Sequence, residues 1–262
     1  MRTLLWFVII CLIAFGGYYY FYMQDNAAAA PDPSLTPMAT STNVSVIPLA
    51  HATGILWWDN TALYFDPVGT AALFAGQPAA DIVLITDIHG DHLSTSTLSS
   101  VVGNAKLIVP QAVKDLLPAE LQAKASVLSN GQSQTVQGFT ITALPMYNLP
   151  SAANKDRHTK GRGNGYLIEK DGFRVYLAGD TAGTPEMRAL TDIDIAIIPM
   201  NPTYTMSVEE AADAVLAFKP KTVYPYHYRE PSGLSDVSKF EQLVNAGNSD
   251  INVVLGAWYP SE

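Results

Sequence analysis

The sequence predicts an α/β protein in which two β-sheets pack together and helices cover their outer faces. Short strands separated by turns begin at Val44, and repeated strand–helix units fill the last part of the chain. Mixed units lie between these two parts. This order is typical of two packed layers of sheet, because each sheet must bury both of its faces.

Apolar runs that end at turn residues identify the strands. Asp81–Thr86 is a continuous apolar run, which is typical of a central strand buried on both faces. Asp171-Gly172 predicts a tight hairpin between the strands on either side. The other strands are expected at Val44–Ile47, Gly54–Trp58, Ala62–Asp66, Lys106–Val109, Gln134–Val136, Phe139–Leu144, Gly165–Glu169, Phe173–Ala178, Ile193–Ile198 and Thr222–Tyr226.

Capping residues mark the helices. Ser207 and Glu210 fit a capping box that starts a helix ending at Phe218. Thr184-Pro185 places an N-cap residue before a proline at the first helical position. Further helices are expected at Thr95–Val102, Gln111–Leu117 and Ser235–Ala246.

The N-terminus reads as a targeting segment, and residues 1–26 are expected to be a signal anchor or a signal peptide. The uncharged apolar run from Leu4 to Met23 is long enough to cross a bilayer as a helix. Ala27 to Ala30 offer small residues for cleavage. Four tyrosines near the end of the run resemble an interfacial belt and favour an uncleaved anchor.

Residues 27–43 are rich in Ala, Pro, Ser and Thr, which predicts a disordered linker. Residues 44–262 then form the folded domain. We therefore expect the protein in the cell envelope, either anchored in the inner membrane or secreted to the periplasm or exterior. Its partner there is the membrane, through the N-terminal segment.

Composition excludes some kinds of function. The net charge of −9 argues against binding to a nucleic-acid backbone. The basic cluster of the chain lies within one stretch, Lys155, Arg157, Lys160 and Arg162. Cys11, the single cysteine, lies in the N-terminal apolar run, so the folded domain has no thiol. Any metal site there must consist of His and carboxylate ligands.

The densest group of chemically active residues follows the buried strand Asp81–Thr86. Asp87, His89, Asp91 and His92 lie together on one glycine-containing turn. Open α/β sheets place their sites at the carboxyl ends of strands, and alternate side chains of this turn can converge on adjacent ions. The alternative is a solvated polar turn, which would have little reason to crowd His and Asp together.

Two further pieces are weak by themselves. Asp180 follows an apolar strand, and a carboxylate can bridge two cations, although a turn or an N-cap is the commoner meaning of Gly-Asp-Thr. His227 ends the strand Thr222–Tyr226, although a histidine between two tyrosines is more often a core residue.

Together these pieces resemble the metallo-β-lactamase superfamily, over roughly Val44 to Tyr259. The leading His-x-His-x-Asp-His motif of that family is matched here with Asp87 in the first place. Asp180 matches the bridging aspartate and His227 the last histidine. The intervening histidine is best matched by His158, with Asn148 as the alternative. The chain looks like the branch that includes ascorbate-6-phosphate lactonase and the N-acylphosphatidylethanolamine phospholipase.

The resemblance implies a four-layer αββα sandwich that binds two divalent metal ions. Zinc is expected first, with manganese or iron as alternatives because Asp87 adds an anionic oxygen ligand. His51 would lie beside the site and hold Asp91 or another carboxylate. The implied metal ligands are Asp87, His89, Asp91, His92, His158, Asp180 and His227.

The implied reaction is hydrolysis of an ester, lactone, amide or phosphodiester by a hydroxide that bridges the metals. Asp91 would orient the hydroxide and pass a proton to the leaving group, and Tyr226 or Lys160 would stabilise the oxyanion. The alternatives are a lipid-directed phosphodiesterase and a metal-binding module without turnover. We expect the loop from Pro145 to Asn164 to gate access for a small-molecule substrate. The basic residues of this loop would favour an anionic substrate.

Overall fold

The computed structural model describes residues 43–259 of the chain. One sheet has six strands in the order β1-β2-β3-β4-β5-β6, with β3 to β6 parallel. Its strands are β1 (Val44–Ala50), β2 (Thr53–Trp58), β3 (Thr61–Phe65), β4 (Ile82–Leu84), β5 (Lys106–Val109) and β6 (Ala125–Val127).

The second sheet has seven strands in the order β15-β12-β11-β10-β9-β8-β7. Its strands are β7 (Ser133–Val136), β8 (Phe139–Met146), β9 (Gly163–Lys170), β10 (Phe173–Leu177), β11 (Ile195–Pro199), β12 (Thr222–Tyr226) and β15 (Asn252–Val253). The strands β10, β11, β12 and β15 run parallel. A small ribbon pairs β13 (Arg229–Glu230) with β14 (Gly233–Leu234).

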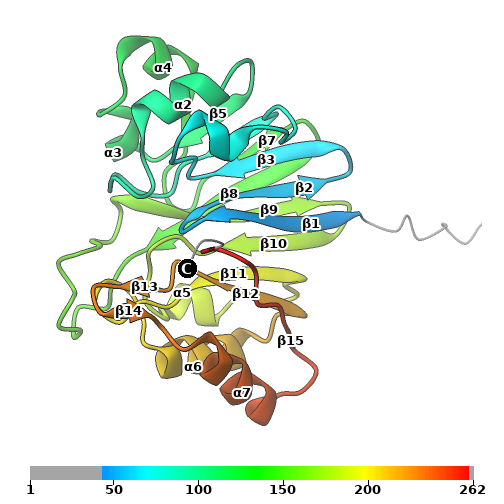
Figure 1. The fold of residues 1–262 in the computed structure, drawn as a ribbon, viewed down its shortest axis with the longest axis vertical. Coiled ribbons are helices and arrows are strands. Elements are labelled where there is room, and N and C mark those ends of the chain that lie inside the picture. The colour runs from blue at the N-terminus through cyan, green and yellow to red at the C-terminus, as the bar shows by residue number, and fades with distance from the viewer. Residues whose placement is uncertain (1–42, 260–262) are drawn as a thin grey trace, which may run out of the picture. The chain divides into compact units, whose positions relative to one another are not determined.

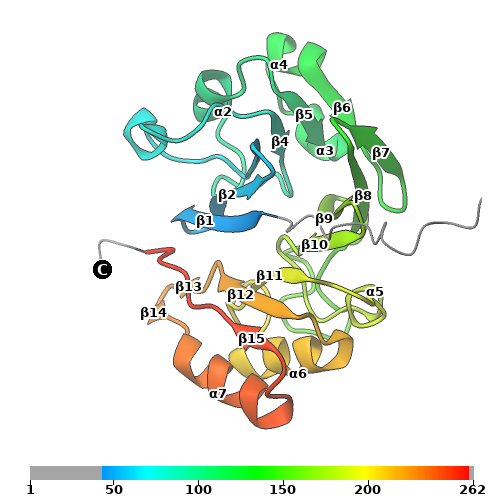
Figure 2. The ribbon, with the colours of Figure 1, turned by 90° about the vertical axis from the view of Figure 1, so that its right-hand side faces the viewer.

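Helices cover the outer face of each sheet, so the described residues form four layers (Figures 1 and 2). The first sheet carries η1 (Ala71–Phe74), α2 (Thr95–Val101), α3 (Gln111–Lys114) and α4 (Ala119–Lys124). The second carries α5 (Pro185–Arg188), α6 (Val208–Phe218) and α7 (Val237–Gly247).

Aromatic side chains join the two sheets. Trp58 of β2 meets Phe139 of β8 edge to face, with ring centroids 5.1 Å apart, and both side chains are fully buried. On the outer face of the second sheet, Tyr176 meets Phe218 of α6 in the same way at 6.2 Å. Burial of each large apolar side chain stabilises the fold by about 1.5–3 kcal/mol. The paired apolar faces therefore explain why this sequence forms a layered structure.

The structure contains every strand and helix that the sequence predicted between Val44 and Tyr259, most of them with shifted ends. The capping box of α6 is formed, since the side chains of Ser207 and Glu210 each accept a hydrogen bond from the backbone of the other residue. Six short elements were not predicted, because they carry little apolar periodicity: η1, α4, β6, β13, β14 and β15.

The predicted N-terminal apolar helix and most of the predicted linker lie outside the described residues. Within residues 43–259, no helix combines the length and apolarity that a membrane crossing requires.

A backbone contact between the sheets fixes where the site forms. The amide of Asn164, in β9, donates to the carbonyl of Thr86, just after β4, at 2.9 Å. A Cβ on Gly163 would approach that carbonyl oxygen to 2.8 Å, so only glycine permits this close packing. The carboxyl end of β4 is thereby held against the second sheet.

Candidate metal centre

The predicted ligands come from loops at the carboxyl ends of strands in both sheets. Asp87, His89, Asp91 and His92 lie in the loop after β4. Asp180 follows β10 and His227 follows β12, while His158 lies in the loop between β8 and β9. The structure brings all seven side chains together. Six of them form two groups of three, and Asp180 contacts a histidine of each group.

The His92 group consists of Asp91, His92 and His227. The Nε2 atoms of His92 and His227 lie 3.2 Å apart. His227 Nε2 is also 3.2 Å from Oδ2 of Asp91, and His92 Nε2 is 3.2 Å from Oδ2 of Asp180. Ligand atoms around one tetrahedral ion, each about 2.1 Å from it, lie about 3.4 Å apart. The spacing of this group therefore suits a metal ion.

The Asp87 group consists of Asp87, His89 and His158. Nδ1 of His89 lies 2.9 Å from Oδ2 of Asp87, and Nε2 of His158 lies 3.9 Å from that oxygen. His158 Nε2 is also 3.1 Å from Oδ2 of Asp180. Asn148, the alternative to His158, donates to the backbone carbonyls of Asn154 and Tyr204 instead. His158 is thus the histidine that the fold brings to the cluster.

Asp180 lies between the two groups. It is almost fully buried, and its Oδ1 atom accepts no hydrogen bond within residues 43–259. Burial alone would raise the pKa of this carboxyl, but His227 and His92 hold it well below its usual value. An ionised, buried carboxylate between two sets of imidazoles, with one oxygen that accepts no hydrogen bond, is suited to bridge cations.

A buried carboxylate behind His92, Asp66, fixes the orientation of its ring. Oδ2 of Asp66 lies 2.7 Å from Nδ1 of His92 and accepts from the hydroxyl of Thr86 at 2.6 Å. The other oxygen accepts from the Thr86 amide at 2.7 Å. Complete burial raises the pKa of Asp66, while His92 and Thr86 oppose the rise. With Nδ1 engaged by Asp66, Nε2 of His92 is directed at the cluster.

Known proteins resemble this chain in sequence over most of the described residues. A family model described as the beta-lactamase superfamily domain matches residues 46–227. The chain belongs to the metallo-β-lactamase superfamily. It is 32% identical over 192 residues to a UPF0173 metal-dependent hydrolase of Thermus thermophilus, covering 71% of this chain and 84% of the relative. It is 29% identical over 169 residues to one from Pyrococcus abyssi, covering 63% and 74%.

Solved structures agree. A crystal structure from Parabacteroides distasonis described as a metal-dependent hydrolase is 35% identical, with a TM-score of 0.72 over 82% of this chain and 93% of that one. The metallo hydrolase Igni18 of Ignicoccus hospitalis, at 24% identity and a TM-score of 0.67 over 81% and 94%, shares the fold. The chain is a metal-dependent hydrolase of this superfamily with candidate metal-binding clusters.

This superfamily member has Asp87 in place of the first histidine of the leading motif. The structure places the guanidinium of Arg162 beside this aspartate. Asp87 is fully buried and accepts two hydrogen bonds from the Arg162 guanidinium, from Nε at 3.1 Å and from Nη2 at 2.8 Å. Burial alone would raise the pKa of Asp87, but His89, His92 and Arg162 lower it. The ion pair between Arg162 and Asp87 was not predicted from the sequence.

His51 contacts Asp91, as expected for a residue beside the site. Its Nε2 lies 3.2 Å from Oδ2 of Asp91, and its Nδ1 lies 2.6 Å from the hydroxyl of Tyr259. Burial lowers the pKa of His51, which favours the neutral ring. Three residues of this region, His51, Asp66 and His227, have left-handed backbone with φ of 53°, 44° and 49°. Such strain is typical of functional sites.

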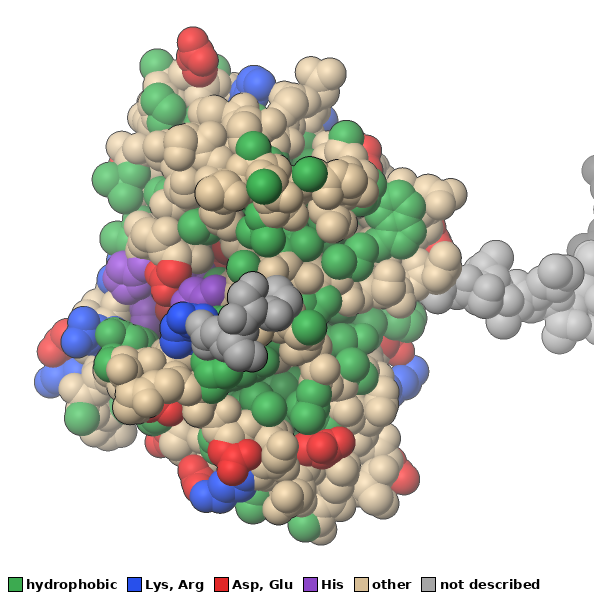
Figure 3. Space-filling model, viewed as in Figure 1, with side chains coloured by type: hydrophobic (Ala, Val, Ile, Leu, Met, Phe, Trp, Pro, Cys, Tyr) green, Lys and Arg blue, Asp and Glu red, His purple; other side chains and the backbone are tan. Residues whose placement is uncertain are grey.

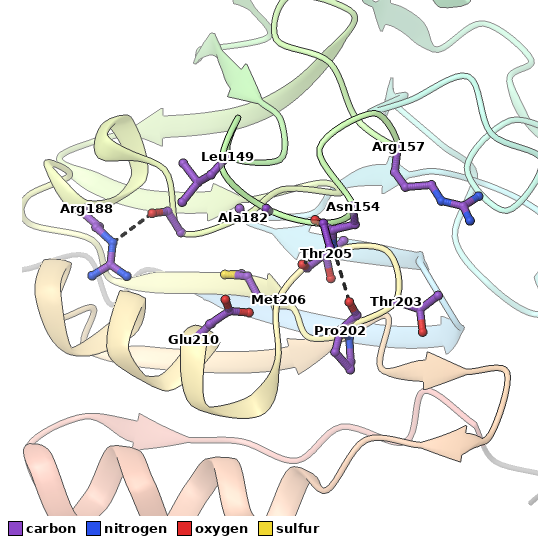
Figure 4. A pocket seen from close by; sticks show the side chains of 13 residues that line it. Leu149, Asn154, Arg157, Ala182, Arg188, Pro202, Thr203, Thr205, Met206 and Glu210 are labelled. Atoms are coloured by element: carbon purple, nitrogen blue, oxygen red, sulfur yellow. Dashed lines mark hydrogen bonds between the residues drawn. The ribbon is translucent and has the colours of Figure 1, made fainter.

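Five of the candidate ligands line a hollow of about 260 Å³ together with Arg157 and Tyr204; they are His89, Asp91, His158, Asp180 and His227. Histidine and acidic side chains gather at one edge of the face in Figure 3, beside basic ones. A second cavity of about 540 Å³ lies beyond Arg157, which lines both. Leu149, Asn154 and Met206 border this second cavity (Figure 4).

The structure keeps two predicted catalytic residues out of the hollow. The side chain of Tyr226 is fully buried between the sheets, where its ring meets Phe65 and Trp258. The ammonium of Lys160 pairs with Glu186 at 2.5 Å and lies over the ring of Tyr147. Arg157 and Tyr204, which the analysis did not assign as catalytic, border the hollow instead. Arg157 belonged to the predicted basic stretch, but nothing in the sequence pointed to Tyr204.

Proposed function

We propose that the protein is a binuclear metal-dependent hydrolase that cleaves an ester, lactone, amide or phosphodiester bond. One observation carries this proposal: the buried Asp180 contacts histidines of both ligand groups, and members of both groups line one hollow. Asp87, His89 and His158 would hold one ion, and Asp91, His92 and His227 the other. Bound ions would polarise the substrate and lower the pKa of a water between them.

The donor set indicates the class of metal. All the candidate ligand atoms are imidazole nitrogens and carboxylate oxygens, which suit zinc. The Asp87 group together with Asp180 offers two carboxylates, so manganese or iron would also be accepted there.

Asp91 is the ligand best placed to handle protons. Its side chain is 43% exposed in the hollow, whereas the side chains of Asp87 and Asp180 are buried. Burial opposes it, but hydrogen bonds with His227 and His51 lower the pKa of Asp91, so the carboxylate is ionised and can accept a hydrogen bond from a water. We assign it the role of orienting the attacking water and returning the proton to the leaving group.

We also propose a small anionic substrate. Of the four basic residues in the loop, Lys160 pairs with Glu186 and Arg162 with Asp87. The Arg157 guanidinium packs over the ring of Tyr204, 5.2 Å from its centroid, and lines both cavities. It would bind a carboxylate or phosphate of the substrate while the rest of the molecule occupies the larger cavity.

The test is a substrate panel run on protein of measured metal content. We expect turnover of a small anionic ester, lactone, amide or phosphodiester that disappears with chelator and returns with metal. Arg157→Met should raise KM for anionic substrates about tenfold or more and leave neutral ones unchanged. Lys155→Met, a cation of the same loop that lines neither cavity, is the control.

Other outcomes of the panel would replace the proposal. Turnover confined to lipid head-group phosphodiesters would make the protein a lipid-directed phosphodiesterase. Stoichiometric metal without turnover of any substrate would make it a metal-binding module.

We propose the cell envelope as the place of this activity, on the strength of the apolar run in residues 1–26. The hydrolase domain would then face the outside of the inner membrane. Protease added to spheroplasts should degrade it, and full protection would contradict this topology.

A further inference from the structure

The two ligand groups differ in the charges that surround them. Behind the His92 group lies the carboxylate of Asp66, 2.7 Å from His92 Nδ1, and the group itself includes the carboxylate of Asp91. Apart from the imidazoles, no cationic side chain forms an ion pair with this group among residues 43–259. A divalent ion placed there is attracted by Asp91, Asp66 and the shared Asp180.

The Asp87 group carries one carboxylate of its own, and Arg162 already neutralises it. The guanidinium binds both oxygens of Asp87, in the two-pronged geometry that makes such pairs strong. Its Nη2 atom also lies 3.4 Å from Nε2 of His89. An ion held by Asp87, His89 and His158 would therefore have a fixed positive charge as a near neighbour.

The side chain of Arg162 is held in place from a second side, besides its contacts with Asp87. Its Nη2 donates to the carbonyl of Arg157 at 2.8 Å, which closes the turn of the loop. The next residue, Gly163, is packed against Met146 and the Thr86 carbonyl. The side chain is only 19% exposed. Its charge is thus a built-in part of the site.

We infer that the two metal positions fill in order, the His92 group first and the Asp87 group second, and that the positive charge of Arg162 sets this order. The inference rests on the proposed binuclear function and adds that, when metal is scarce, the protein holds one ion. Arg162 acts here as a positioning and charge-setting residue for the second ion, and it makes no contact with the first group.

Metal titration at one fixed pH tests the order. Metal-free protein is titrated with zinc against a chromophoric chelator, and the two dissociation constants are read directly. We expect them to differ by more than about tenfold in the unmodified protein, as expected for one nearby unit charge. His158→Ala should remove the weaker step, and His227→Ala should remove the stronger one.

Substitution of Arg162 tests the cause. Arg162→Met should tighten the weaker step about tenfold and leave the stronger step unchanged. Arg162→Lys keeps the charge without the two-pronged geometry, so both constants should stay close to those of the unmodified protein. Lys155→Met removes a charge from the same loop at a site that touches no ligand, and it should change neither step.

Three results would overturn the inference. They are equal dissociation constants in the unmodified protein, dissociation constants that Arg162→Met does not change, and loss of the weaker binding step in that variant. The last would mean that the arginine is needed to hold Asp87 in place. If Arg162→Met fails to fold, the unmodified protein and Arg162→Lys still decide the order. Two equal steps with turnover contradict this inference alone, whereas metal without turnover contradicts the proposed function.

Discussion

The two halves of the candidate metal centre differ in the charge of the side chain that orients a buried ligand. A buried ligand must be held in one orientation by a partner behind it. His92 is held by the Asp66 carboxylate, while Asp87, an anion in the place of a histidine, is held by the Arg162 guanidinium. When the ligand changes from a neutral ring to an anion, the partner behind it changes from an anion to a cation. The charge of each buried ligand is therefore matched by the charge of the side chain that orients it.

Removal of the residue common to both halves should have the largest effect. Asp180→Ala takes away the carboxylate that touches both groups, so metal binding should fall below half an equivalent and turnover should fall to the uncatalysed level. Plasma emission spectrometry and the substrate panel measure the two quantities. Asp194→Asn should keep both, because this buried carboxylate just before β11 accepts from the Lys221 ammonium and the Arg174 backbone amide. Retained turnover in Asp180→Ala would separate the activity from this cluster.

The support behind His92 can be tested separately. Asp66→Asn keeps the size of the side chain but removes the anion, and metal affinity of the His92 group should fall about 10- to 100-fold. Competition with a chelator measures the constant. Asp81→Asn is the control, because Asp81 accepts from the Ala62 amide on the same sheet, far from the ligands. An unchanged constant in Asp66→Asn would mean that packing alone orients the ring.

The pH dependence of the stability of the metal-free protein follows from the same His92 group. Burial would lower the pKa of His92, but Asp180 and Asp66 raise it well above its usual value. A raised pKa in the folded state stabilises the fold fully below the unfolded value, about 6.5, and this stability is lost as pH rises through the folded value.

The melting temperature of metal-free protein should therefore fall as pH rises from about 6 to about 9. Scanning calorimetry at constant ionic strength measures it, and His92→Gln should flatten the trend. Metal-loaded protein should show no such fall, because the ion takes the place of the proton. A melting temperature that rises over this range in the metal-free protein would contradict the pairing.

The smallest effect is expected at Lys160. Because its ammonium pairs with Glu186 at the surface and does not line the hollow, Lys160→Met should change kcat/KM less than about twofold. Steady-state kinetics on one anionic and one neutral substrate measure this. A large loss of kcat would restore the oxyanion role that the sequence analysis gave to this lysine.

The sequence could predict that most of the candidate ligands converge, because most of them lie just after apolar strands; His158, in a long loop, was placed by the family resemblance. His89, Asp180 and His227 lie in the loops that follow apolar strands, and parallel strands bring their carboxyl ends to one edge. The strands themselves followed from apolar runs and turn residues. The short strands β13, β14 and β15 have too few residues to show a period.

The supporting residues could not be predicted in the same way, because they act across long separations. Arg162 lies 75 residues from Asp87, and Asp66 lies 26 from His92. Asp66 does follow an apolar strand, which was a signal that could have been used. Tyr226 was predicted as an oxyanion donor because it adjoins His227. Neighbours in a strand point to opposite faces, however, and the side chain of Tyr226 is buried in the core.

Equilibrium dialysis of the purified protein against increasing free zinc, with turnover measured on the same samples, tests the central claim most directly. The account predicts about two equivalents at saturation, with turnover that is lost on chelation and returns as metal is restored. Chelator-treated protein that binds less than half an equivalent and still hydrolyses its substrate at the full rate would contradict it.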